Sequence, residues 1–335
     1  MISKKLTTVI VAILLLTGSA VGAWQYLAKP PSRPLVEITL QMPWTANAGY
    51  AGFYMADDKG DFAKQGLKVK MVPGGPGFNL PAILAAGKAD LAIINGAEII
   101  RARESGIPLK AVACTYKRSP LVFITMKASG LDHPRKFANK KTRASNQNKI
   151  VLSALLSKFG VPHGDLKVLR SRDVKDLRDG KFDIWAGYSA ISLEQIRRQG
   201  WIDEVNVFHP DNFGVHFYYS CVVFMDKMIQ ERPDIVQGFL HASMKDGWRR
   251  AFKDPKAAAK LVEKYGAVFN IEHEAITISK MLPLIDAGTG DIGWVEKDGW
   301  ESMIQTIYGE RLIKTPMRAD DVFDDRFLKA IYNRK

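Results

Sequence analysis

Cysteine and metal-ligand patterns are scarce in this sequence. Its 335 residues include two cysteines and six histidines, and neither type recurs at the spacing of a zinc site. A disulfide-dense scaffold is therefore excluded, and we expect no metal site. Cys114 and Cys221 both fall in apolar, strand-like runs. Sequence leaves open whether they are free thiols or form a disulfide, because a disulfide demands a geometry that spacing does not reveal.

The chain also lacks low-complexity segments and a C-terminal membrane span, and its acidic residues are fewer than its basic ones, 35 against 48. The net charge of +13 is compatible with nucleic acid, an anionic membrane or an anionic solute as a partner. Because the basic residues are spread along the chain with only short clusters, we interpret the charge as a solvated basic surface. No nucleic-acid partner is expected.

The first 23 residues have the pattern of a secretory signal peptide. Lys4 and Lys5 precede an uncharged apolar stretch over residues 6–17, and small residues follow up to Ala23. This order predicts export and cleavage near Ala23, and no cysteine stands near position 20 to form a lipoprotein anchor. An uncleaved anchor is the alternative, since the apolar stretch with its small residues is just long enough to span a bilayer. Residues 24–35, which are rich in proline, are expected to form a linker.

Strand-like and helix-like segments alternate through most of the chain. The first unit has a strand at 38–42, a helix at 53–65, a strand at 67–72 and a glycine-rich loop at 73–77. The alternation resumes between residues 129 and 211. This order predicts an α/β fold with two lobes, each a mixed sheet flanked by helices.

The chain is expected to leave the first lobe and later return to it. A strand that ends at Met126 leads out, and the β-prone run from Tyr218 to Met225 leads back. Helices then decorate the first lobe, one of them over residues 233–252 with an apolar stripe. We therefore expect a discontinuous lobe 1, residues 36–127 and 219–335, and a lobe 2, residues 128–218.

Short motifs in a fixed order resemble those of the periplasmic solute-binding proteins of ABC importers, in the group that binds thiamine pyrimidine precursors, alkylsulfonates and nitrate. The resemblance covers most of residues 36–330 and is closest to the pyrimidine-precursor branch. Its motifs include Trp44-x-x-Asn47, Gly52-Phe53-Tyr54-Met55-Ala56, Lys59-Gly60-x-Phe62, Pro73-Gly74-Gly75-Pro76-Gly77, Gly87-Lys88-Ala89-Asp90 and Gly180-Lys181-x-Asp183.

The resemblance implies a type II binding-protein fold whose lobes are joined by a hinge of crossing strands. For this hinge we expect Leu121 to Lys127 and Ser220 to Asp226. Such proteins trap a solute between the lobes, so that the solute shifts an open-closed equilibrium. We expect a monomeric periplasmic protein that is not an enzyme and has no cofactor. Its partners are a small aromatic or heterocyclic solute, similar to a thiamine pyrimidine precursor, and an ABC permease in the inner membrane.

Candidate solute-binding residues stand in loops at strand ends, where ligands bind in α/β sheets. Trp44 and Tyr50 offer aromatic faces to a planar heterocycle, and Asn47 offers both a donor and an acceptor. Gly75 allows close backbone approach, and Asn79 begins the following helix. For each candidate the alternative is a structural role, such as packing under a loop or capping a helix. The remaining candidates follow other strands: Asn95, Ser145, Asn146, Tyr188, Ser192 and Tyr218.

The sequence departs from the pattern of the pyrimidine binders at two places, and two other functions are considered for it. Residues 190–192 contain no acid where pyrimidine binders of the group carry one, and position 50 is Tyr where many of them carry His. Both differences favour a different aromatic solute or a less basic one.

One rival function is that of a periplasmic sensor that signals to a membrane partner. The other is the fungal pyrimidine synthase, whose cofactor-bearing lysine and active-site histidine fall on Ile94 and Glu98 here. No lysine at that place can form a Schiff base with pyridoxal phosphate.

Overall fold

The protein is described here by a computed structural model. It describes residues 34–75, 77–162, 168–169, 171, 173–266, 270–286 and 288–334, with the side chains of residues 146, 147, 168 and 169 excepted. The expected signal peptide and most of the expected linker lie outside these residues. Within the described residues, no helix has the length and apolar character needed to cross a membrane.

The first of two sheets has the strand order β2-β1-β3-β10-β4. β1 runs parallel to β3, whereas β10 runs antiparallel to both β3 and β4. The carboxyl ends of β1, β3 and β4 therefore lie at the same edge as the beginning of β10. The strands span β1 Val36–Gln41, β2 Leu67–Val72, β3 Leu91–Ile94, β4 Leu109–Tyr116 and β10 Tyr219–Met225.

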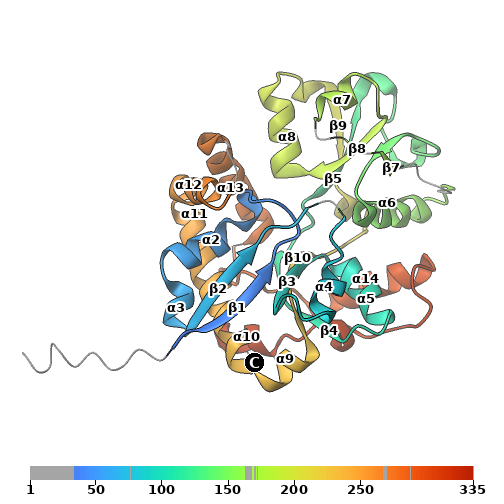
Figure 1. The fold of residues 1–335 in the computed structure, drawn as a ribbon. Helices are drawn as coiled ribbons and strands as arrows, with labels where there is room; N and C mark the ends of the chain where they lie inside the picture. Colours follow the sequence, from blue (N-terminus) through green and yellow to red (C-terminus); the bar gives the residue numbers. More distant parts are fainter. Residues whose placement is uncertain are drawn as a thin grey trace, which may run out of the picture. The chain divides into compact units, whose positions relative to one another are not determined.

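The second sheet has the order β7-β6-β8-β5-β9 (Figure 1). β6 is parallel to β7 and β8, and β5 is antiparallel to β8 and β9. Its core on one face includes Trp185, Trp201 and Ile196, so this sheet buries apolar surface of its own. The strands span β5 Leu121–Met126, β6 Thr142–Arg143, β7 Val168–Leu169, β8 Ile184–Tyr188 and β9 Val205–Phe208.

The strand β5 belongs to the second sheet, which corrects the expected position of the hinge. Residues 121–127 were expected to cross between lobes, but β5 is paired on both sides within the second sheet. β10, expected as the other crossing strand, is a member of the first sheet. The segments that connect the sheets are instead residues 117–120 and 209–218. Local sequence indicates that a strand forms, whereas its sheet is decided by partners distant in the chain. We propose that the lobe boundaries fall in these two segments.

Helices flank both sheets (Figure 1). Around the second sheet they are η2 Lys127–Ser129, η3 Pro134–Lys136, α6 Asn146–Lys158, α7 Lys175–Arg178, α8 Ser189–Arg198, η4 Ile202–Glu204 and η5 Pro210–Phe213. The others are η1 Ala48–Tyr50, α2 Ala51–Asp58, α3 Asp61–Lys64, α4 Leu80–Ala85, α5 Gly96–Glu104, α9 Asp226–Glu231, α10 Pro233–Leu240, η6 His241–Gly247, α11 Trp248–Lys253, α12 Pro255–Lys264, α13 Ile271–Ile285, α14 Lys297–Gly309, α15 Ala319–Val322 and α16 Arg326–Tyr332.

The helix expected over 233–252 forms, with a π-helical segment, η6, in its middle. Its predicted apolar stripe is buried, from Val236 to Trp248. Next to the stripe, Gly247 packs directly on the backbone of α2, where a Cβ atom would lie 2.1 Å from the Gly52 carbonyl oxygen. Only glycine fits at this contact, and the helix therefore approaches α2 closely.

The two cysteines form a disulfide, which decides the question that the sequence left open. Cys114 of β4 and Cys221 of β10 stand directly opposite each other in the ladder, 107 residues apart in sequence, with an S–S distance of 2.06 Å. Two residues further, at the end of the same pair of strands, Tyr116 stands opposite Tyr219. Because side chains alternate along a strand, the disulfide and this tyrosine pair share one face of the sheet.

Candidate functional site

Four tyrosines from the two sheets meet where strand ends face one another, and we call them the tyrosine cluster. Tyr50 ends η1, which follows β1, Tyr116 ends β4, Tyr219 begins β10, and Tyr188 ends β8 of the second sheet. The Tyr188 ring stands edge-on to Tyr116 and Tyr219, with centroid distances of 6.5 and 5.8 Å. Tyr188 is half-buried and the other three are buried. The carboxyl ends of β1, β4 and β8 and the beginning of β10 thus converge on one aromatic centre, at the kind of sheet edge where ligands bind in α/β folds.

The hydroxyls of the tyrosine cluster are neutral at physiological pH. Burial raises the pKa of Tyr188 to about 12, and it raises the pKa values of Tyr50, Tyr116 and Tyr219 further. Among the described residues, no lysine or arginine is a cause of these four shifts. The cluster therefore presents aromatic faces and neutral hydroxyl groups.

Asn95 connects the tyrosine cluster to the start of β10. Its Oδ1 accepts a hydrogen bond from the Ser220 backbone N–H at 3.1 Å, and its side chain also interacts with the Tyr188 hydroxyl. Ser220 has a φ of 51°, in the left-handed region that side chains other than glycine rarely adopt. Such strain is maintained only where surrounding contacts demand it. Asn95 of the first sheet therefore fixes both a strained backbone and a side chain of the second sheet.

The two connecting segments are tied together beside the tyrosine cluster. Asp211 accepts a hydrogen bond from the Ser119 N–H at 3.1 Å, and its other carboxylate oxygen lies 3.2 Å from His216 Nδ1. The Ser189 N–H, directly after Tyr188, donates to the Pro120 carbonyl at 2.8 Å. Both connections between the sheets therefore pass close to the proposed site, and a change in their geometry would move its two halves relative to each other.

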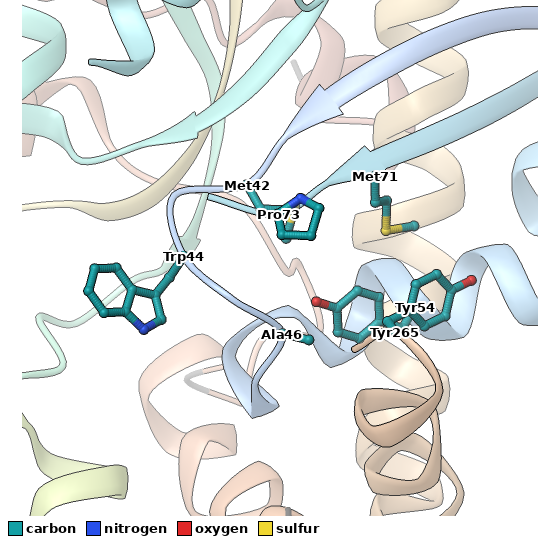
Figure 2. A pocket seen from close by; sticks show the side chains of 7 residues that line it. All are labelled: Met42, Trp44, Ala46, Tyr54, Met71, Pro73 and Tyr265. Carbon is teal, nitrogen blue, oxygen red and sulfur yellow. The ribbon is translucent and has the colours of Figure 1, made fainter. Parts of the chain in front are cut away.

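Trp44, predicted to stack on a ligand, is 42% exposed. It lines a small hollow with Met42, Ala46, Tyr54, Met71, Pro73 and Tyr265. Figure 2 shows its ring turned away from Tyr54 and Tyr265, which stack on each other at a centroid distance of 4.4 Å. The Trp44 side chain is thus a surface group beside the loop that leads to Tyr50, and its role in binding stays a prediction.

We expect the Trp44→Ala variant to weaken solute binding while leaving the melting temperature of the solute-free protein nearly unchanged. Loss of an aromatic stacking contact costs about 1 to 3 kcal/mol, whereas a side chain that is 42% exposed contributes little to the core. Calorimetric titration and thermal unfolding measure the two effects separately. A fall in melting temperature that matches the fall in affinity would instead show that Trp44 supports the fold.

Asn47, Gly75 and Asn79 have local structural contacts. The Asn47 Oδ1 caps η1 by accepting the Gly49 N–H at 2.8 Å, and Asn79 caps α4 through the Ala82 N–H at 3.1 Å. In the glycine-rich loop it is Gly74 that needs glycine, since a Cβ there would lie 2.2 Å from the Met42 carbonyl oxygen. A Cβ at Gly75 would meet only an ordinary contact of 3.7 Å. Asn47 lies next to the tyrosine cluster, because its side chain hydrogen-bonds to Tyr50.

The second-sheet candidates other than Tyr188 also have structural partners. Ser145 is exposed and caps α6 by accepting the Asn148 N–H at 3.2 Å. The side chain of Asn146 lies outside the described residues. Ser192 is buried and accepts a hydrogen bond from the Trp185 indole at 3.4 Å. Its hydroxyl occupies the space beside Gly187, where a Cβ would lie 2.1 Å from it.

Tyr218 is directed away from the tyrosine cluster, although it immediately precedes Tyr219. Its hydroxyl donates to the Glu296 carbonyl at 3.0 Å, and a Cβ at Gly299 would lie 1.9 Å from that oxygen. Tyr218 is therefore packed against α14. Neighbouring residues of an extended chain point to opposite sides, so Tyr219 faces the other way and joins the cluster.

Tyr116 and Tyr219 are not among the residues predicted from the sequence. Neither is Glu274 of α13, whose Oε2 accepts the Ala48 N–H at 2.8 Å. The signal for the two tyrosines was present, because each stands two residues from a cysteine at the end of a predicted strand. Their pairing required the register of β4 with β10, which joins residues about a hundred positions apart. Among the described residues, no group of three His, Cys, Asp or Glu side chains has an arrangement suited to a metal ion.

Comparison with known proteins finds a family match over most of the chain. The sequence model described as NMT1/THI5 like matches residues 47–258. The chain is 23% identical to the formylaminopyrimidine-binding protein of Halalkalibacterium halodurans, across 96% of this chain and 98% of that protein. It is 24% identical to the riboflavin-binding protein RibY of Chloroflexus aurantiacus, across 97% of both.

The chain is also similar to an enzyme over part of its length and to a solved structure at low sequence identity. A 4-amino-5-hydroxymethyl-2-methylpyrimidine phosphate synthase of Schizosaccharomyces pombe is 21% identical over 62% of this chain and 63% of the enzyme. The periplasmic aliphatic sulphonate binding protein SsuA of Escherichia coli superposes with a TM-score of 0.62 at 15% identity, covering 85% of this chain and 91% of that one. This structural likeness shows the fold, and it confirms the expected two-lobed α/β architecture of periplasmic binding proteins.

Proposed function

The chain belongs to the NMT1/THI5-like family, and on that premise we propose that it is the solute-binding component of an ABC importer, acting on a small aromatic or heterocyclic compound outside the cytoplasm. The observation that carries this proposal is the tyrosine cluster, in which strand ends of both sheets supply aromatic rings to one place. Aromatic faces bind planar rings by stacking, and buried hydroxyls orient their polar edges. Similarity to binding proteins over nearly the whole chain supports the proposal.

The proposed solute contacts are the tyrosine cluster, Asn95 and the exposed ring of Trp44. Tyr50, Tyr116, Tyr219 and Asn95 would form the first-sheet side of the site, and Tyr188 the second-sheet side. A solute that touches both sides is bound more tightly by a closed form than by an open one, so it shifts the population toward closure. A permease that recognises the closed form would then receive only loaded protein. We propose a monomeric periplasmic protein as the form that fulfils this role.

A synthase activity is not favoured by the residues at the corresponding place. Position 94, where the resemblance puts the cofactor-bearing lysine, is Ile94, which is 1% exposed in β3 and stands opposite Cys221 of the disulfide. An isoleucine side chain has no amine for a Schiff base. The residues present therefore do not fit pyridoxal phosphate bound in that manner.

A thermal-shift screen of the purified protein tests the proposed function. The panel holds aminopyrimidines, flavins, alkylsulfonates and unrelated sugars and amino acids. A ligand that binds only the folded protein raises its melting temperature by mass action, and we expect stabilisation by at least one aromatic heterocycle. Stabilisation by a sugar or an amino acid alone would contradict the aromatic class, and stabilisation by none would contradict the carrier function for all classes tested.

An ion pair between the two sides of the site is expected to favour closure. Lys280 of α13 binds Glu194 of α8, which flanks the second sheet, and Glu194 also binds Arg197 at 2.8 Å. The Lys280 side chain is 40% exposed, so solvent screens the pair and its contribution is about 0.5 kcal/mol. We expect Lys280→Met to weaken solute binding about twofold and to increase the apo radius of gyration in small-angle scattering. Lys260→Met, on the exposed surface of α12, is the matched control. Equal solute affinity and equal radius of gyration in the two variants would show that the ion pair between Lys280 and Glu194 does not favour closure.

A further inference from the structure

Glu274 differs from the other buried acids of the described residues. Those acids are Asp61, Glu194 and Glu274. Asp61 is paired with Arg250 and Lys64 at 3.0 and 2.7 Å, and Glu194 is paired with Arg197 and Lys280. For Glu274 the described residues supply no cation; its hydrogen bond comes from a backbone N–H, that of Ala48. A carboxylate with two oxygens accepts several hydrogen bonds, and burying it without a cation is costly.

An unsatisfied hydroxyl stands on the same face of the same helix. Thr277 follows Glu274 by three residues in α13 and is 1% exposed. Residues three apart are neighbours on a helix surface. The Thr277 Oγ1 is buried without a hydrogen-bond partner in the described part of the chain. The helix thus presents a carboxyl and a hydroxyl group side by side, and each has unused hydrogen-bonding capacity.

Glu274, the first member of this pair, lies beside the tyrosine cluster. α13 packs against η1 and also against α8 of the second-sheet region. The Ala48 N–H bound by Glu274 is two residues before Tyr50, and a Cβ at Gly49 would lie 3.8 Å from the Tyr116 hydroxyl. Burial raises the pKa of Glu274, opposed only by the Ala48 hydrogen bond. The carboxyl group is therefore desolvated at the border of the proposed site.

A purely structural role explains only part of this arrangement. An acid in the first turn of a helix interacts favourably with the helix dipole, and Glu274 lies in the first turn of α13. Glu272 in the same turn supplies that interaction while remaining exposed to solvent. Accepting one backbone N–H needs an oxygen atom but no charge. Neither role accounts for a buried acid next to an unsatisfied hydroxyl.

We propose that Glu274 is a specificity-determining residue of the solute site, which binds the amidine-like edge of an amino-substituted nitrogen heterocycle, with Thr277 as a second contact. A carboxylate accepts two parallel hydrogen bonds from an exocyclic amine and an adjacent protonated ring nitrogen, in the geometry of other bidentate pairs. The inference rests on the proposed function and narrows its solute class to weakly basic heterocycles.

Calorimetric titration with three probes tests this assignment. The probes are 4-amino-2-methylpyrimidine, the corresponding 2-methylpyrimidin-4-one without an amino group, and benzenesulfonate. We expect the aminopyrimidine to bind about tenfold or more tightly than either other probe, and Glu274→Gln to remove that advantage while keeping the affinity for the pyrimidinone. Glutamine retains an acceptor for the Ala48 N–H, so the loop is preserved. Glu272→Gln, on the exposed side of the same turn, should bind all three probes as the unaltered protein does.

The possible outcomes separate this inference from the proposed function. If Glu274→Gln keeps the full preference for the aminopyrimidine, or if the unaltered protein prefers benzenesulfonate or the pyrimidinone, the inference is overturned and the carrier function stands. If the unaltered protein binds none of the probes and no aromatic solute of the thermal-shift panel, the proposed function fails and the inference with it. If the glutamine variant does not fold, the preference of the unaltered protein among the three probes still decides whether the proposed solute class holds.

Discussion

The Tyr188→Ala variant is expected to lose solute affinity by a factor on the order of 100, because truncating a central aromatic side chain of a binding site costs about 2 to 4 kcal/mol. Tyr188 is the member of the tyrosine cluster supplied by the second sheet, and its ring contacts Tyr116 and Tyr219 of the first. Its loss would remove the aromatic contact that the second sheet adds when the lobes close. Isothermal titration with whichever solute stabilises the protein measures the effect.

The controls for this prediction separate binding from folding. Tyr188→Phe keeps the ring and removes only the hydroxyl group that interacts with Asn95, so we expect a smaller loss, about tenfold or less. Tyr308→Ala removes a tyrosine that is 46% exposed on α14 and should leave affinity unchanged. If Tyr188→Ala binds the solute as tightly as Tyr308→Ala does, the tyrosine cluster is not the binding site.

Removal of the disulfide is expected to give the largest loss of stability. Cys114 and Cys221 are 107 residues apart in sequence, and the loop-entropy model assigns a crosslink over such a loop about 4 to 5 kcal/mol of the free energy of unfolding. That amount is a large fraction of the roughly 5 to 15 kcal/mol by which domains are stable. We expect the Cys114→Ala, Cys221→Ala double variant to unfold at a correspondingly lower denaturant concentration.

The disulfide also supports the site, because the Tyr116–Tyr219 pair is its neighbour on the same two strands. The double variant should therefore bind the solute more weakly even under conditions where it is fully folded. The unaltered protein in a reducing agent should unfold with the midpoint of the double variant. An unchanged midpoint in both cases would show that the crosslink does not form in the protein or that it contributes nothing to its stability.

Local sequence patterns predicted much of the fold, because helices and strands depend on periodicity. The stripe of residues 233–252 was readable from hydrophobic spacing. The strand predicted over residues 218–225 forms as β10, which begins one residue later, at Tyr219. The prediction that residues 121–127 cross between the lobes was wrong, because the partners of a strand decide to which sheet it belongs. β5 pairs with β8, which lies about 60 residues later in the chain. No pattern within residues 121–126 distinguishes a strand that ends one sheet from a strand in the middle of another.

The candidate site was harder to predict, since the same residue types cap helices and bind ligands. Asn79 and Ser145 follow strands, as ligand-binding residues do, but their side chains accept hydrogen bonds from helix N-termini. Asn95 also follows a strand, but its side chain accepts a hydrogen bond from the Ser220 N–H of β10, within the site. The choice between Tyr218 and Tyr219 depended on the position at which β10 begins, and a shift of one residue reverses which side chain faces the site.

Native mass spectrometry of the gently purified protein tests the central claim most directly, namely that a small aromatic heterocycle is held between the two sheets. We expect a population whose mass exceeds that of the chain by one small molecule, which is identified on release as an aromatic nitrogen heterocycle. We expect this population to be absent in Tyr188→Ala. A released molecule without an aromatic ring, or one retained at the same occupancy by Tyr188→Ala, would contradict the account.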